Sequence, residues 1–102
     1  MKIETTADDA FTKVEVVGRF DAFEVEGFDV VVGPLLQDDA AHVIVDLSQV
    51  EFVDSSALAA LVRSMKRARE VGGDVVLHNP SEPVTVILEL TRLDAAFDIT
   101  RD

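Results

Sequence analysis

Apolar and polar residues near the start of the chain alternate at every second position, which is the period of a half-buried strand. Residues 2–6 form a weak first candidate strand, and residues 11–17 form a clearer second one. The second strand alternates valines with charged side chains: Lys13, Val14, Glu15 and Val16. Because only a polar turn at residues 7–10 separates the two strands, they are predicted to pair as an antiparallel hairpin.

A helical segment is predicted next, with Asp21 as its cap and Glu24 reaching back to complete a capping box. Apolar residues then recur at helical spacing: Val25, Phe28 and Val32. Gly33-Pro34 should interrupt this helix, because proline lacks an N–H donor and its ring crowds the preceding turn. The apolar pair at residues 35–36 still needs burial, so a short helical turn is expected there.

The middle of the chain predicts a central strand and a long helix. Residues 42–47 form the most continuous apolar run, which suits a strand inside the sheet. Residues 55–71 are predicted to be an amphipathic helix. Its apolar face consists of Leu58, Leu61, Val62, Met65 and Ala68. Gly72-Gly73 should end this helix, because glycine adopts the left-handed conformation at low cost.

Three further elements complete the pattern. Residues 75–78 are predicted to be a strand, and Ser81 to begin a third helix with Pro83 in its first turn. A short last strand contains Phe97 and Ile99. Consecutive strands joined through helices pair in parallel with right-handed crossovers. The predicted fold class is therefore α/β, a mixed sheet that is parallel except for its leading hairpin, with three main helices.

Length and charge limit the classes of function. The 102 residues suit a single domain over residues 1–102, and the absence of cysteine excludes disulfides and thiolate metal sites. A formal net charge of −11 repels nucleic-acid backbones and anionic lipids, so no direct binding to either is expected. Neither a signal peptide nor an apolar run of roughly 20 residues is present, so we expect a cytoplasmic protein without membrane insertion.

Catalytic chemistry finds little support in the sequence. The two histidines, His42 and His78, both fall in strand patterns and predict no Ser–His–acid arrangement. Gly72-Gly73 follows a helix and precedes a strand, which is the opposite order to a phosphate-binding loop. Metal-ligand spacing is also absent. We therefore predict a protein that is not an enzyme and that uses no metal, cofactor or small-molecule ligand.

Residues 45–58 form the most distinctive segment. A buried strand is predicted to end, a short loop to follow, and a helix to begin with Asp54-Ser55-Ser56. Helix N-termini in α/β folds lie at the carboxyl edge of the sheet, where functional sites gather. On spacing alone, these residues are also explained as a helix cap with no further function.

This segment, which reads VDLSQVEFVDSSAL, resembles the signature of the STAS domain family, typified by bacterial anti-sigma factor antagonists. Residues 17–21 resemble the family's entry to its first helix. Residues 78–81 and 88–97 resemble its last helix and strand. The resemblance covers nearly the whole chain in the right order, and it implies a STAS-like sheet.

The resemblance implies that the chain binds an anti-sigma factor, often one that is also a kinase, and so frees a sigma factor. In the family, phosphorylation of the serine directly after the signature aspartate breaks the complex. By position that serine is Ser55, with Ser56 as the runner-up, and a phosphatase would be a further partner. The residues expected around the phosphorylation site are Asp21, Asp46, Asp54 and Ala57, the last of which replaces a glycine common in the family.

The predicted helix over residues 55–71 also carries a group of cations. Four of the nine basic residues lie close together: Arg63, Lys66, Arg67 and Arg69. The first three lie opposite the apolar face. Together with Ser56 and Ala60, they form a candidate surface for an acidic patch on the partner. The alternative is a solvated face whose cations suit the C-terminal half of a helix.

Two other functions fit parts of the sequence. A receiver-like protein would use Asp46 as a phosphoacceptor at the end of a strand, but it would need a late lysine, and no lysine follows Lys66. Alternatively, a STAS domain without a phosphoswitch would serve as a scaffold or accessory subunit of a transport or signalling complex. The sequence leaves this second alternative open.

Overall fold

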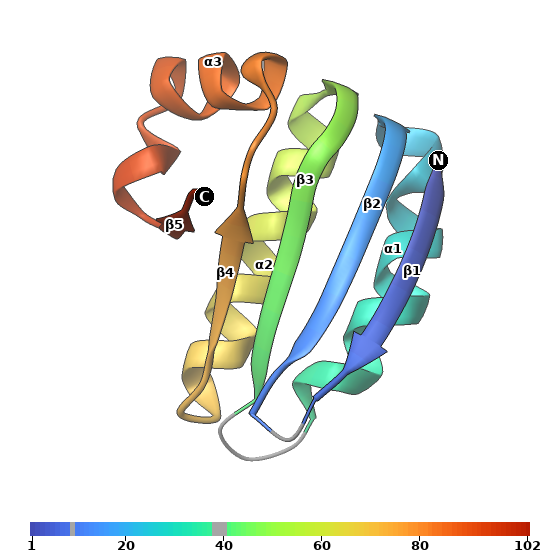
Figure 1. The fold of residues 1–102 in the computed structure, drawn as a ribbon, viewed down its shortest axis with the longest axis vertical. Coiled ribbons are helices and arrows are strands. Elements are labelled where there is room, and N and C mark those ends of the chain that lie inside the picture. The colour runs from blue at the N-terminus through green and yellow to red at the C-terminus, as the bar shows by residue number, and fades with distance from the viewer. Residues whose placement is uncertain (9, 38–40) are drawn as a thin grey trace.

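The computed structural model describes residues 1–8, 10–37 and 41–102. Five strands form one sheet in the order β1-β2-β3-β4-β5 (Figure 1). The strands are β1 (Lys2–Ala7), β2 (Thr12–Phe20), β3 (His42–Val53), β4 (Asp74–His78) and β5 (Asp98–Thr100). The α-helices are α1 (Val25–Val32), α2 (Ser55–Glu70) and α3 (Glu82–Leu90). Three 3-10 turns accompany them: η1 (Ala22–Glu24), η2 (Gly33–Leu36) and η3 (Leu93–Ala95).

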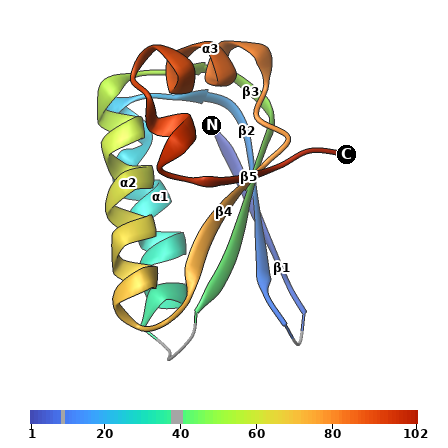
Figure 2. The same ribbon diagram turned by 90° about the vertical axis from the view of Figure 1, so that its left-hand side faces the viewer.

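The sheet is mixed, as the sequence predicts. β1 pairs antiparallel with β2, and the other neighbouring strands pair in parallel. The helices α1 and α2 lie along one face of the sheet, and α3 lies over the end where β3 finishes (Figure 2). Within the described residues no helix covers the opposite face. The α/β class, the leading hairpin and the order of elements are confirmed.

The core lies between the sheet and the helices α1 and α2. In β3, the side chains of Val43, Val45 and Leu47 are buried, while Ile44, between two of them, is only partly buried. This alternation assigns the three buried residues to the helix-covered face, because successive strand side chains point to opposite faces. From α2, the apolar face packs onto this layer through Leu58, Leu61, Met65 and Ala68.

β3 is longer than the sequence predicts. It continues from His42 to Val53 instead of ending at residue 47, so the expected loop over residues 48–53 is wrong. Polar residues in this stretch resemble a loop, but the strand accommodates them at partly or fully exposed positions: Ser48, Gln49 and Glu51. Register shifts between β2 and β3 keep the extended segment paired.

The first helical segment begins as a 3-10 turn capped by Asp21, whose carboxylate accepts a hydrogen bond from the Phe23 N–H (3.1 Å). The predicted capping box is wrong in its second half. The Glu24 carboxylate lies 3.5 Å from the amino group of Met1 and pairs with it instead. Gly33-Pro34 ends α1 and begins η2, as expected.

Later boundaries also follow the sequence. Gly72 adopts a φ of +82° after α2. A Cβ atom on Gly73 would collide with the Ala41 carbonyl oxygen, so only glycine lets this turn pass the start of β3. Ser81 precedes α3, and Pro83 lies in its first turn.

Candidate functional site

Asp54 joins the start of α2 to the start of η1. Its Oδ1 atom accepts a hydrogen bond from the Ala57 N–H (2.9 Å) and so caps α2. Its Oδ2 atom accepts one from the Ala22 N–H (2.9 Å). The Asp54 amide donates to the Phe20 carbonyl oxygen at 3.4 Å. These bonds hold together the carboxyl ends of two neighbouring parallel strands, β2 and β3.

Ser55 and Ser56 are the first two residues of α2, and both are exposed. The first N–H groups of an α-helix have no acceptor within the helix. Asp54 takes the N–H of Ala57 and leaves those of the two serines at the open end. The dipole of this 16-residue helix adds partial positive charge at the same place. A negatively charged group on either serine would therefore be stabilised by the helix end.

Two exposed aromatic side chains flank Asp54, and the sequence does not predict their role. Phe23 directly follows Ala22 and is 93% exposed. Phe52 is 37% exposed, and the Cζ atom of Arg19 lies 4.2 Å from its ring centroid. Exposed aromatic residues are enriched in protein–protein interfaces. One signal in the sequence could have identified Phe23: this aromatic residue does not share the helical spacing of the apolar residues of α1.

The predicted partner-binding surface is wrong at Ala60. This residue is 0% exposed and belongs to the core. The buried face of α2 is wider than the sequence predicts, because it also takes in three small residues: Ala57, Ala60 and Ser64. The Ala57 side chain is likewise buried, and its N–H donates a hydrogen bond to Asp54.

Three exposed cations share one side of α2: Arg63, Lys66 and Arg67. Arg63 extends towards α1, where its Nη2 atom lies 3.5 Å from the Asp29 carboxylate. Arg69 points elsewhere, since it bonds to the Asp74 carboxylate (3.0 Å) and to the Ala96 carbonyl oxygen (3.0 Å). The cationic surface on α2 thus consists of the first three residues only.

The sequence profile of the STAS domain matches residues 2–102, almost the whole chain. The chain belongs to the STAS domain family. Among its relatives is the anti-sigma-B factor antagonist of Staphylococcus aureus (strain NCTC 8325 / PS 47), which is 29% identical over 93 residues. That alignment covers 91% of this chain and 86% of the relative.

Solved structures share the fold of this STAS domain. An anti-sigma-factor antagonist (STAS) domain protein from Planctomyces limnophilus matches with a TM-score of 0.87 and 27% identity, over 98% of this chain and 90% of that chain. The Bacillus cell fate determinant SpoIIAA in its phosphorylated form matches with a TM-score of 0.79 and 17% identity, over 99% and 91% of the two chains. Its unphosphorylated form gives a TM-score of 0.83 at 18% identity, over 99% and 88%. At this identity the likeness to SpoIIAA concerns the fold alone.

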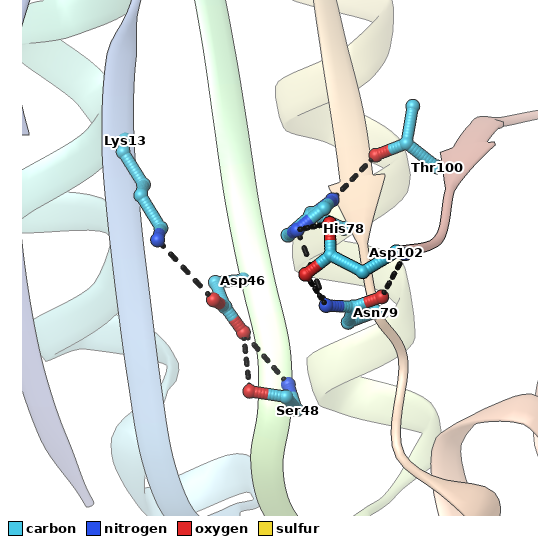
Figure 3. A network of polar contacts seen from close by, with 7 residues as sticks. All are labelled: Lys13, Asp46, Ser48, His78, Asn79, Thr100 and Asp102. Atoms are coloured by element: carbon cyan, nitrogen blue, oxygen red, sulfur yellow. Dashed lines mark hydrogen bonds and ion pairs between the residues drawn. The ribbon is translucent and has the colours of Figure 1, made fainter.

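In this STAS domain Asp46 lies far from Ser55, so its predicted place beside the phosphorylation site is wrong. It sits inside β3, about 23 Å along the strand from Val53. Its carboxylate accepts hydrogen bonds from the Ser48 hydroxyl (2.7 Å) and amide (2.9 Å) and lies 3.5 Å from Lys13 Nζ (Figure 3). This position inside a strand also argues against the receiver-like alternative, which needs the aspartate at a strand end.

The pKa of Asp46 reflects these contacts. Burial raises it, but the hydrogen bonds from Ser48 and the positive charge of Lys13 outweigh burial and hold the pKa below its usual value. Asp46 is therefore a structural carboxylate that stays ionised at neutral pH.

The two histidines of the STAS domain lie at the start of β3 and at the end of β4. His78 Nδ1 lies 2.7 Å from Thr100 Oγ1, and its Nε2 lies 3.6 Å from the Asp102 carboxylate (Figure 3). His42 is exposed at the start of β3. In the same part of the chain, no cluster of three His, Cys, Asp or Glu side chains could hold a metal ion. None of the described helices is long and apolar enough to cross a membrane.

Proposed function

We propose that this chain is a non-enzymatic anti-sigma factor antagonist, which binds an anti-sigma factor that is also a serine kinase. The kinase would transfer the γ-phosphoryl group of ATP to Ser55 Oγ, releasing ADP and a proton, and the complex would then dissociate. A phosphatase would hydrolyse the phosphoserine and restore binding. All of these partners would act in the cytoplasm.

The observation that carries this proposal is the placement of Ser55. An exposed serine lies at the open N-terminus of α2, directly after the capping residue Asp54, in a chain whose relatives are named anti-sigma factor antagonists. Exposure does not separate Ser55 from Ser56, because both are exposed. The position directly after Asp54 favours Ser55, since that is where the family carries its phosphorylated serine.

The fold should tolerate a phosphate on Ser55. A phosphoserine carries about −1.5 to −2 charges and three acceptor oxygens. The open N–H groups and the dipole of α2 stabilise an anion there. SpoIIAA, a protein of the same fold, has been solved with and without its phosphate, which is consistent with a modification that leaves this fold intact.

A bound partner should tolerate the same phosphate poorly. A partner that packs over the start of α2 and the exposed Phe23 would have to remove water from a strongly hydrated dianion. The Asp54 carboxylate next to it adds a like charge. Phosphorylation should therefore weaken binding much more than it weakens folding.

The test uses the purified chain, ATP and each anti-sigma factor kinase of the source organism, with the phosphate located by mass spectrometry and binding measured by calorimetry. We expect phosphate on Ser55. Ser55→Ala should bind but remain bound in the presence of ATP, and Ser55→Asp should fold but bind poorly. Ser56→Ala is the matched control and should still be phosphorylated.

Two results would contradict the assignment of Ser55: stoichiometric phosphate on Ser56 in the wild type, or undiminished phosphorylation of Ser55→Ala. Stable binding to a signalling or transport protein without any phosphorylation would instead favour the scaffold or accessory-subunit alternative.

A further inference from the structure

A shallow groove runs between α2 and the segment formed by α1 and η2. It consists of two adjoining hollows of about 580 Å³ and about 300 Å³. Both hollows are lined by Leu36, Arg63 and Arg67, and the larger also by Lys66. Leu36 is buried, whereas the three cations are exposed. The exposed wall that α2 contributes to the groove is therefore cationic.

Positive charge is concentrated here in a chain whose net charge is −11. Two carboxylates also line the groove, Asp29 and Glu70, and Asp29 is paired with Arg63. Lys66 and Arg67 form no ion pair with any residue that the structure describes. Both side chains are exposed, and their positive charges distinguish this surface in a chain with an excess of acidic residues.

We infer that this groove binds an acidic, extended peptide segment of the anti-sigma factor, a second contact that builds on the proposed function. Arg63, Lys66 and Arg67 follow one another at helical spacing along one side of α2, so they present charge as a strip and not as a point. Two adjoining open hollows lined by such a strip suit a peptide with several carboxylates better than a single small anion.

The groove and Ser55 lie at different ends of α2. Lys66 and Arg67 follow Ser55 by eleven and twelve residues, which corresponds to about 16–18 Å along the helix axis. This distance exceeds the Debye length of about 8 Å at physiological ionic strength. A phosphate on Ser55 should therefore leave the groove unaffected, so the acidic segment can hold the kinase near Ser55 without being part of the switch.

The experiment measures binding of a fluorescein-labelled ten-residue peptide of alternating glutamate and glycine by fluorescence anisotropy. Wild-type chain should bind it, and the affinity should fall as NaCl is raised. Lys66→Glu/Arg67→Glu should lose about tenfold or more in affinity while it keeps the wild-type circular dichroism spectrum and unfolds cooperatively. The matched control, Lys2→Glu/Arg92→Glu, carries the same change in net charge and should bind as the wild type does.

Several outcomes would overturn the inference. Unchanged peptide binding by Lys66→Glu/Arg67→Glu places the peptide elsewhere. An equal loss of peptide affinity in both double variants would mean that binding depends only on the net charge of the chain. Displacement of the peptide by millimolar inorganic phosphate at constant ionic strength makes the groove a site for small anions instead.

A second measurement separates this inference from the proposed function. Ser55→Asp should bind the acidic peptide with wild-type affinity while binding the anti-sigma factor poorly. If Lys66→Glu/Arg67→Glu binds the anti-sigma factor with wild-type affinity and is phosphorylated on Ser55, the groove is not a docking site and the proposed function stands. If Ser55→Asp binds the anti-sigma factor normally while Lys66→Glu/Arg67→Glu does not, the proposed phosphoswitch is contradicted and the groove remains supported as a docking site.

Discussion

At the scale of single residues, two aspartates have different roles. Asp46 lies within β3, and Asp54 directly follows this strand. Asp54 satisfies one N–H at the start of α2 and one at the start of η1, so it positions the serines that follow it. Asp46 lies on the sheet face opposite α1 and α2, where it accepts a hydrogen bond from Ser48 and pairs with Lys13. Their similar chemistry in the sequence suggests a shared site, but β3 keeps them apart.

The lowered pKa of Asp46 predicts a dependence of stability on pH. A carboxyl group whose pKa is lower in the folded chain stabilises the fold above its unfolded pKa of about 4. That stabilisation is lost as the pH falls through the lower, folded pKa. Urea unfolding should therefore give wild-type chain a steeper loss of unfolding free energy than Asp46→Asn between about pH 5 and about pH 3.

Lys13→Met provides the companion variant, because it removes the positive charge but keeps the Ser48 hydrogen bonds. Its slope should lie between those of the wild type and Asp46→Asn. Parallel curves for all three proteins would show that Asp46 does not contribute to acid sensitivity.

At the scale of elements, α2 connects the site to the core. Its N-terminus presents Ser55 and Ser56, its inner face is anchored by Leu61, and its outer face carries the cations of the groove. The small residues Ala57 and Ala60 widen the inner face beyond the stripe visible in the sequence. One helix thus fixes the proposed phosphorylation site and the groove at a set distance from each other.

The packing of α2 predicts the effect of truncating Leu61, which is 0% exposed. Leu61→Ala should lower the free energy of unfolding by about 2–5 kcal/mol, measured by urea denaturation. Leu90→Ala makes the same chemical change at a residue that is 76% exposed, and it should cost less than about 0.5 kcal/mol. Similar values for the two variants would be incompatible with α2 packing through Leu61.

At the scale of the whole molecule, the helices α1 and α2 cover one face of the sheet, and no helix in the described part of the chain covers the other (Figure 2). The chain carries a net charge of −11. Polar networks around the buried Asp46 and the half-buried His78 join residues of β2, β3, β4 and β5. The excess of acidic residues also makes the folded chain repel itself, because folding brings like charges closer together.

This self-repulsion predicts that salt stabilises the fold. Raising NaCl from about 20 mM to about 300 mM at neutral pH shortens the range of charge repulsion and should raise the urea midpoint of unfolding. The double variant Lys66→Glu/Arg67→Glu increases the negative charge, so its midpoint should rise more. A midpoint that falls with salt would indicate that local ion pairs, such as Arg63–Asp29, outweigh the net repulsion.

The sequence by itself determines the order of elements, the hairpin, the central strand and the start of α2 at Asp54. These features depend on local signals: period-two alternation, helical spacing, capping residues and glycine or proline at the ends. It also identifies the family, because the matching segments follow one another along nearly the whole chain.

Only the tertiary structure decides which distant residues meet. The bond from Ala22 to Asp54 joins positions 32 residues apart, and the groove pairs α2 with η2. The continuation of β3 to Val53 depends on pairing with β2, which moves Asp46 away from the serines. Ala60 is buried because the buried face of α2 is wider than the stripe formed by its large apolar residues. Such features follow from the packing of elements against one another, which local periodicity does not encode.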